Sequence, residues 1–343
     1  MRQVRIGDRL LGEGHPVFVI AEVGYNFNLL DEALRSVDAA AEAGVDAIKI
    51  QTFRAETVTT RAGDFPPEAG GINQYEEFKR YEISEEVHRL VFARARERGL
   101  IPFSTPSYFD DVDLLERVGV DLYKIGSDDL TNLPFLRYVA ARKKPVIFSS
   151  GMATLSEVDE AIRTMQEAGN GDLVLLHCVS NYPIKDLRVV NLRVIESYRQ
   201  AFGIPVGLSD HTTTLSAAVA AVALGACVIE RHFTLSKDLP VPDAFFSADP
   251  TEMRALVGAV RETERMLGDG IKRPSATEWQ MRKDTRKSIV ARRPIAMGQT
   301  IEPDDLIVKR PGWGIPPRDW GCVIGRKARR TIGEDEVITW DMV

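Results

Sequence analysis

The chain has 343 residues, more than one hydrophobic core normally organises, and its hydrophobic (44%) and charged (27%) fractions are typical of a folded globular protein. Its 44 basic and 50 acidic residues are scattered along the chain and give a net charge of −6, which excludes the basic surface that nucleic-acid binding requires. No apolar run approaches the ~18 residues of a membrane span, and the N-terminus lacks a signal-peptide layout, so no membrane association is expected.

From Phe18 to about Leu267, short apolar runs alternate with amphipathic stretches, a pattern that predicts a parallel sheet covered by helices. Eight such pairs of run and stretch within about 250 residues predict an α/β fold, a closed (β/α)8 TIM barrel. A doubly wound open sheet is the alternative, but no glycine-rich dinucleotide motif follows the first run. The expected strands begin near Phe18, Ala47, Pro102, Leu122, Val146, Leu173, Val206 and Cys227.

Several of the predicted helices end in glycine. The stretches LDEALRSVDAAAEAG, TLSEVDEAIRTMQEAG and TLSAAVAAVALG finish at Gly44, Gly169 and Gly225. We expect left-handed C-caps there, because glycine adopts a positive φ without steric cost. The helical stretch PTEMRALVGAVRETERMLG follows the last run, so the barrel is expected to occupy residues 1–268.

The chain changes character after the barrel. A polar stretch, residues 269–284, is expected to be a linker, and residues 285–343 carry the short β-type runs SIVA, LIVKR and VITW between glycines and prolines. A segment of this size is close to the lower limit for a domain that folds alone. We therefore expect a small, mostly β domain that rests against another surface.

The carboxyl ends of barrel strands converge on one mouth, so polar residues there are candidates for a common site. Lys49 in AIKIQT and Lys124 in LYKIGS are the most informative, since a lysine flanked by isoleucines in a barrel strand must point its ammonium group at solvent, an anion or a carboxylate. A buried pair with a neighbouring Glu or Asp is the alternative for each, but two such lysines favour an anionic substrate. Hydroxyls that complete an anion site or cap the next helix follow at Thr105, Ser127, Ser149, Ser180 and Ser209.

Two histidines end neighbouring strands of the predicted barrel, His211 the seventh and His232 the eighth. Two imidazoles at one mouth are the usual nucleus of a borderline-metal site, and they leave coordination positions open. For each, the alternative is a core histidine that hydrogen-bonds to the backbone. Asp210 or Glu230 could orient the rings or cap the next helix.

In chain order, these motifs closely resemble the sialic acid synthase (N-acetylneuraminate synthase) family. The C-terminal region, with MGQTI, a DDL run and KRPGWGIP, resembles the antifreeze-like (SAF) domain of these enzymes. The resemblance spans nearly the whole chain. The matching stretches are IAEVGYN (20–26), IKIQTF (48–53), FSTP (103–106), YKIGS (123–127), SSGMAT (149–154), LHCVSNYP (176–183), GLSDHT (207–212), ERHFT (230–234) and PDAFFS (242–247).

The resemblance implies a metal-dependent enzyme that condenses phosphoenolpyruvate with N-acetylmannosamine or a related acylamino sugar and releases phosphate. Legionaminate, pseudaminate and other nonulosonate synthases are alternatives within the family. Two other classes stay open: a pyruvate aldolase with a Schiff base on Lys49 or Lys124, and a non-catalytic binder of ice or carbohydrate. Mn²⁺ is the implied cofactor, held by His211 and His232, with Mg²⁺ or Co²⁺ as alternatives.

The resemblance also assigns roles to single residues. Glu22, Lys49 and Lys124 are implied to be catalytic; the family commonly has Gly-Glu after the serine of YKIGS, whereas this chain has Asp128 and Asp129, and Asp129 is given the acidic role. Phosphoenolpyruvate is implied to contact Lys49, Gln51, Thr105, Lys124, Ser127, Ser149, Ser180 and Ser209, and the sugar to contact Tyr182 and Asp243.

A domain-swapped homodimer is implied as well, in which Arg310 reaches the substrate in the partner's barrel. The three cysteines are dispersed and odd in number, so they do not indicate a disulfide framework. A reducing, cytoplasmic location is therefore expected, with small-molecule substrates and neither nucleic acid nor membrane as partners.

Overall fold

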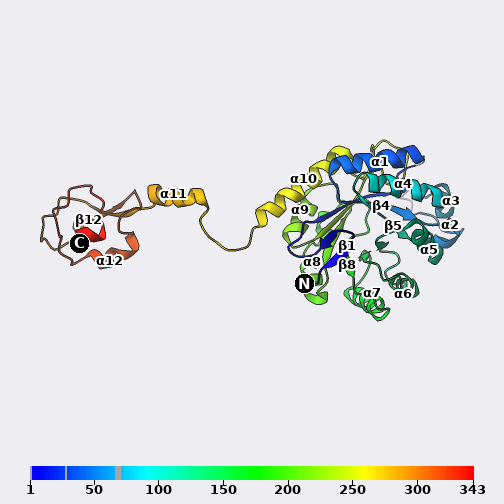
Figure 1. Cartoon of the computed structure of the whole chain (residues 1–343), viewed down its shortest axis with the longest axis horizontal. Coiled ribbons are helices and arrows are strands. Elements are labelled where there is room, and N and C mark those ends of the chain that lie inside the picture. Colours follow the sequence, from blue (N-terminus) through cyan, green and yellow to red (C-terminus); the bar gives the residue numbers. More distant parts are fainter. Residues whose placement is uncertain (1, 28, 66–70) are drawn as a thin grey trace. The chain divides into compact units, whose positions relative to one another are not determined.

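The structure, a computed structural model, describes residues 2–27, 29–65 and 71–343. The chain divides into two compact units, Met1–Gly268 and Asp269–Val343 (Figure 1). Each unit has a hydrophobic core of its own. Within the described ranges, no helix is both long enough and apolar enough to cross a bilayer.

The first unit is a parallel barrel, which confirms the predicted TIM-barrel fold. Its eight strands pair in the order β5-β4-β3-β10-β9-β8-β7-β6, and β5 and β6, the two ends of this order, lie in contact and close the sheet. All eight predicted runs form strands. These are β3 (Phe18–Gly24), β4 (Ala47–Thr52), β5 (Ile101–Pro106), β6 (Tyr123–Ile125), β7 (Val146–Ser149), β8 (Leu173–Cys178), β9 (Val206–Asp210) and β10 (Val228–His232).

Helices surround the strands (Figure 1). The predicted glycine caps are confirmed, since Gly44, Gly169 and Gly225 have φ values of 87°, 83° and 93°. Two short helices, α2 (Ala55–Val58) and α3 (Gln74–Arg80), lie between β4 and α4. The other helices are α1 (Leu30–Ala43), α4 (Glu85–Glu97), α5 (Phe109–Val118), α6 (Leu133–Ala140), α7 (Leu155–Glu167), α8 (Val194–Phe202), α9 (Ser216–Ala223) and α10 (Pro250–Leu267), with a 3-10 turn, η2, at Leu187–Val190.

The barrel has two apolar layers. The larger packs the outward side chains of the strands against the helices. The smaller fills the barrel interior, where Phe18, Phe103 and Ile147 pack with residues of a hairpin formed by β1 (Val4–Ile6) and β2 (Arg9–Leu11). This hairpin, which the sequence pattern did not predict, supplies apolar side chains to the interior below the strand ends.

The second unit is built around the antiparallel pair β11 (Ser288–Ala291) and β12 (Leu306–Lys309). Two of the three predicted β-type runs are therefore strands, whereas VITW makes only an isolated bridge through Val337 to Val290. The stretch predicted to be a linker contains helix α11 (Ala276–Thr285), which begins with a capping box. The remaining elements are η3 (Pro303–Asp305), η4 (Pro317–Asp319), α12 (Trp320–Val323) and η5 (Trp340–Met342).

Gly207 in β9 lies where the barrel leaves no room for a side chain. A Cβ atom there would lie 2.4 Å from the carbonyl oxygen of Val228 and 2.7 Å from Cδ2 of Leu176. Because the backbone of β10 cannot move away without breaking its pairing, Gly207→Ala is expected to destabilise the protein by about 1–3 kcal/mol. Thermal unfolding followed by circular dichroism measures the effect.

Gly258 is the matched control, because it lies in the middle of α10 and a Cβ there meets nothing within 4 Å. Gly258→Ala is expected to leave stability unchanged or to raise it by roughly 0.5–1 kcal/mol. Equal stability of the two variants would contradict the packing described for β9.

Candidate active site

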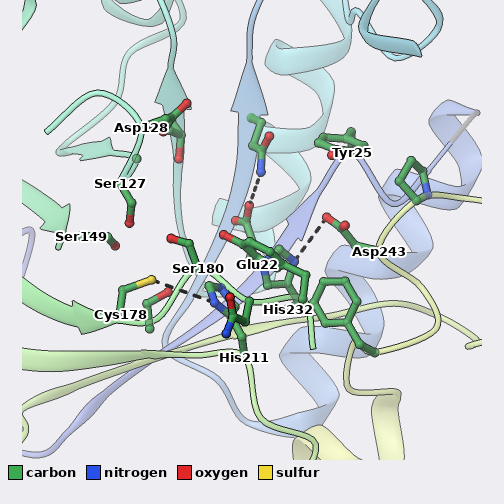
Figure 2. A pocket seen from close by; sticks show the side chains of 18 of the residues that line it. Glu22, Tyr25, Ser127, Asp128, Ser149, Cys178, Ser180, His211, His232 and Asp243 are labelled. Atoms are coloured by element: carbon green, nitrogen blue, oxygen red, sulfur yellow. Dashed lines mark hydrogen bonds and ion pairs between the residues drawn. The ribbon is translucent and has the colours of Figure 1, made fainter. Parts of the chain in front are cut away.

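Polar side chains gather at the carboxyl end of the barrel because strand residues alternate between its two faces. Two residues after Ile20 of the interior layer comes Glu22, and two after Leu122 comes Lys124, so both point into the barrel. A cavity of about 970 Å³ opens there (Figure 2). The predicted site residues that line it are Glu22, Lys49, Gln51, Thr105, Lys124, Ser127, Ser149, Ser180, Tyr182, Ser209, His211, His232 and Asp243.

Two lysines and two glutamates meet at the floor of the cavity, and none of the four is more than 5% exposed. Lys49 Nζ lies 2.7 Å from Glu22 Oε2 and 3.8 Å from Glu230 Oε2. Lys124 Nζ lies 3.8 Å from Glu230 Oε1. The lysines therefore have carboxylate partners, which was the alternative for each, and they also line the cavity. We call these four residues the charge quartet.

Burial opposes every charge in the quartet, and the neighbouring charges decide the outcome. Burial would lower the pKa of Lys49, but Glu22 and Glu230 outweigh it and raise that pKa. Burial dominates at Lys124 and lowers its pKa, and burial likewise raises the pKa of Glu22. Against burial, Lys124 and Lys49 hold the pKa of Glu230 below its usual range.

Uncharged side chains fix the quartet in place. Each of the four groups has a hydrogen bond to a neutral side chain on its own or an adjacent strand, which is how buried charges are normally satisfied. The bonds run from Lys49 Nζ to Thr105 Oγ1 (3.0 Å), from Lys124 Nζ to Ser149 Oγ (2.6 Å), from Gln51 Nε2 to Glu22 Oε1 (3.0 Å) and from Ser209 Oγ to Glu230 Oε1 (2.8 Å).

Small groups open one side of the cavity beside Lys124. The Gly151 N–H donates to Ser127 Oγ at 3.0 Å. A Cβ at Gly151 would lie 2.1 Å from Ser180 Oγ and 2.7 Å from Ser127 Oγ, so only glycine fits between the two hydroxyls. Figure 2 shows Ser127, Ser149 and Cys178 along this side of the cavity. A backbone amide, hydroxyls and an ammonium group together suit an anion.

The two predicted metal ligands lie side by side, with ring centroids 5.3 Å apart. His211 Nδ1 lies 2.8 Å from the carbonyl oxygen of Val179, which can only accept, so Nδ1 carries the proton and the Nε2 lone pair is free. His232 Nδ1 lies 3.5 Å from Asp243 Oδ2 (Figure 2). Burial, together with His211, lowers the pKa of His232 well below its usual value, so its imidazole is neutral at neutral pH.

Burial would lower the pKa of His211, but Cys178 and the Val179 carbonyl outweigh it and raise that pKa. A divalent ion binds the deprotonated imidazole nitrogen, so it would compete with a proton at His211, and the spacing allows one ion to meet both rings. Among the described residues, no group of three or more His, Cys, Asp or Glu side chains is arranged to hold a metal. The two histidines therefore fit an ion that keeps several positions for water or substrate. The alternative for each histidine was a core residue that hydrogen-bonds to the backbone. His211 Nδ1 has such a partner in the Val179 carbonyl oxygen, whereas His232 Nδ1 lies near the Asp243 carboxyl group.

Two predicted site residues do not line the cavity. Asp129 accepts a hydrogen bond from Asn132 Nδ2 at 3.0 Å, next to the start of α6, whereas its neighbour Asp128 is part of the cavity wall. Burial raises the pKa of Asp129 to about 6. Arg310 belongs to the second unit, where it is exposed directly after β12. Of the two neighbouring carboxyl groups, Asp128 and Asp129, the one that lines this cavity is thus Asp128.

Asn26, which the sequence reasoning left out, holds part of the cavity wall. Its Nδ2 donates to the Phe233 carbonyl oxygen (3.2 Å) and to Ser247 Oγ (3.1 Å), and its Oδ1 accepts from the Asp243 N–H (3.1 Å). Asn26 is 1% exposed. It fixes the segment that carries Asp243 and Phe246 beside His232. A polar residue just beyond the end of a buried strand was the available signal.

Comparison with known proteins agrees with this fold. The NeuB family model matches residues 36–272 and the SAF domain model matches residues 286–343. The chain belongs to the NeuB family. Relatives of this chain are named as synthases of sialic, legionaminic and pseudaminic acids. NeuB is an enzyme family of nonulosonic acid synthases, which confirms the resemblance seen in the motifs.

Individual relatives cover almost the whole chain. N,N'-diacetyllegionaminic acid synthase of Legionella pneumophila is 40% identical over 344 residues, covering 97% of this chain and 96% of its own. Human N-acetylneuraminate-9-phosphate synthase is 36% identical over 345 residues, covering 98% and 95%. The crystal structure of N-acetylneuraminic acid synthetase from Leptospira borgpetersenii with citrate has a TM-score of 0.74 and 32% identity, covering 82% of this chain and 95% of the other.

Removal of one charge from the quartet should be costly. Lys49→Met leaves Glu22 as a buried carboxylate without its partner at 2.7 Å, so we expect a loss of roughly 3–5 kcal/mol in the free energy of unfolding. Lys49→Met combined with Glu22→Gln removes both charges and should recover most of that loss. Urea denaturation of the two variants and the parent protein measures the difference.

Lys185→Met is the matched control, because Lys185 is exposed on the same cavity wall. It should change stability by less than about 0.5 kcal/mol. If the single and double quartet variants were equally unstable, Lys49 and Glu22 would not be paired as described.

Proposed function

We propose that this protein condenses phosphoenolpyruvate with an acylamino sugar aldehyde to give a nonulosonic acid of the sialic type and inorganic phosphate. The observation that carries the proposal is the charge quartet with its two lysines facing one cavity beside two adjacent imidazoles. Relatives named as sialic, legionaminic and pseudaminic acid synthases support the same reaction.

Phosphoenolpyruvate fits the floor of the cavity by charge. Its carboxylate and phosphate need two separate cationic groups, which Lys49 and Lys124 supply, each already next to a hydroxyl, Thr105 or Ser149. On the Lys124 side, Ser127 Oγ accepts from the Gly151 N–H, which leaves its own hydroxyl proton to donate to the ligand. Fixed donors in a buried cavity stabilise an anion far more than donors in water do.

The reaction forms a C–C bond and a C–O bond to water and breaks the C–O bond to phosphate, while the sugar's aldehyde oxygen takes up a proton and becomes a hydroxyl. C3 of phosphoenolpyruvate attacks the aldehyde carbon of the open-chain sugar and forms the C–C bond, which leaves C2 electron-poor. Water adds at C2, held by Glu22, whose raised pKa lets the carboxylate take up a proton from that water. The C2–O bond then breaks, and phosphate leaves with the oxygen that linked it to carbon.

The acceptor sugar is proposed to lie in the outer half of the cavity. Tyr182 and Asp243 line this part, and Asp128 takes the acidic role first given to Asp129. Asp128 and Glu77 give the outer wall two carboxylates against one lysine, Lys185, among the described residues, and burial raises the pKa of Asp243 to about 7. This wall favours an uncharged acceptor over a sugar phosphate.

A panel of acceptors with phosphoenolpyruvate labelled with ¹⁸O in the bridging position tests the reaction. Phosphate carrying the label should be released only with an acylamino sugar, because the C–O bond and not the P–O bond breaks. N-acetylmannosamine and its diacetamido and deoxy relatives should be used at least ten-fold better than N-acetylmannosamine 6-phosphate. Unlabelled phosphate would contradict the mechanism.

Trapping with borohydride distinguishes the proposed reaction from that of a Schiff-base aldolase. A Schiff-base aldolase would use pyruvate, and borohydride would then trap it covalently on Lys49 or Lys124. No trapping is expected with this protein. Stable capture of labelled pyruvate on either lysine would overturn the proposal.

A divalent ion, Mn²⁺ before Mg²⁺ or Co²⁺, is proposed to bind His211 and His232. When bound, it supplies a Lewis acid for the sugar's aldehyde oxygen. The protein's own contribution is to lower the pKa of His232 by burial, so that this imidazole is neutral, and to hold His211 by the Val179 carbonyl.

Exhaustive chelation with EDTA is expected to abolish turnover, and added Mn²⁺ to restore it. The control is chelated protein that receives an equal concentration of Ca²⁺, an ion that prefers oxygen ligands and should restore little. Full activity after chelation would exclude the metal role.

The second unit is proposed to act in a homodimer, with Arg310 at the acceptor sugar of the partner's barrel. It carries more basic than acidic residues, whereas the barrel carries more acidic than basic ones, so the two have complementary charge. A monomer in sedimentation equilibrium at assay concentration would contradict this.

A further inference from the structure

A buried ion pair lies directly beside the two histidines and belongs to neither the charge quartet nor the cavity wall. Asp210 and Arg231 are 2% and 5% exposed, and Asp210 Oδ2 lies 2.5 Å from Arg231 Nη1. We infer that Asp210 and Arg231 are positioning residues, which fix the distance between His211 and His232. The inference rests on the proposed role of these histidines as metal ligands.

The register of two strands connects the pair to the histidines. Asp210 in β9 and Arg231 in β10 are Cα partners in the parallel ladder, and each directly precedes one of the histidines. Because side chains alternate along a strand, His211 and His232 enter the cavity while Asp210 and Arg231 point to the helix side. A slip of β9 against β10 by one residue would break the ion pair and separate the two rings.

The pair also fixes the backbone that follows His211. Asp210 Oδ1 accepts from the Thr212 N–H at 2.8 Å, and Arg231 Nη1 donates to the Thr214 carbonyl oxygen at 3.3 Å and to Thr212 Oγ1 at 3.4 Å. On its other side, His211 is held by its own Nδ1 bond to Val179. The imidazole is thus fixed from both directions.

Stability alone does not account for this pair. Two buried charges lose their hydration, and apolar side chains of similar volume often stabilise a core equally well or better. An ion pair with three further hydrogen bonds is directional, however, and favours one register of β9 and β10. Because Asp210 and Arg231 each lie one residue before a histidine, the register that they fix also sets the positions of His211 and His232.

The test combines a variant of this pair with a matched variant at the opposite end of the barrel. Asp210→Asn with Arg231→Gln removes both charges and keeps similar volumes, so no buried charge is left alone. The control is Asp46→Asn, because Asp46 is also buried and pairs with Arg261 at 2.7 Å and Arg9 at 3.1 Å. For each protein, Mn²⁺ affinity is measured by electron paramagnetic resonance, stability by thermal unfolding, and the KM for phosphoenolpyruvate by phosphate release.

The double variant is expected to bind Mn²⁺ about 10- to 100-fold more weakly, with the KM for phosphoenolpyruvate changed less than two-fold. Asp46→Asn should lower the melting temperature and leave Mn²⁺ affinity unchanged. Wild-type Mn²⁺ affinity in the double variant would overturn the inference. If the unaltered protein bound no Mn²⁺, the proposed metal role itself would fail, and the positioning role with it.

Discussion

The balance of four buried charges is the constraint on which this active site depends. Lys49, Lys124, Glu22 and Glu230 lie at the floor of one cavity, where an uncompensated charge would be strongly unfavourable. Two positive and two negative groups cancel before any ligand enters. An anionic substrate must therefore attract the ammonium groups more strongly than the carboxylates do, which selects for a ligand with more than one negative charge.

The barrel provides this balance through its geometry. Alternation along each strand places an apolar side chain such as Ile20 in the interior and a charged one such as Glu22 one step above it. The β1–β2 hairpin packs into the lower interior, so a layer of apolar side chains lies directly beneath the charged one. Low polarity beneath the quartet strengthens each electrostatic interaction within it.

Much of this arrangement could be predicted from sequence because it depends on periodicity. Eight apolar runs predicted the strands of the barrel, and polar residues at the ends of these runs, from Glu22 to His232, line its cavity. The position of Asp129 could not be predicted in this way, since strand alternation stops after β6 and a turn decides which carboxylate faces the cavity.

Other features depend on contacts that a linear pattern does not contain. The hairpin strands Val4–Ile6 and Arg9–Leu11 are too short to show a hydrophobic period. The role of Arg231 depends on its ion pair with Asp210 in the neighbouring strand. Helix α11 did have a signal, because Ser275 and Glu278 form a capping box inside a stretch interpreted as a linker from its polarity. Polarity alone was a poor guide there, since no residue of α11 is buried and such a helix needs no continuous apolar face.

The most direct measurement of the central claim is a crystal structure of the protein soaked with Mn²⁺ and phosphoenolpyruvate, with anomalous data collected for manganese. The account predicts an anomalous peak within bonding distance of both His211 and His232, and phosphoenolpyruvate oxygens in contact with Lys49 and Lys124. Phosphoenolpyruvate bound away from the two lysines, or manganese bound away from the two histidines, would contradict it.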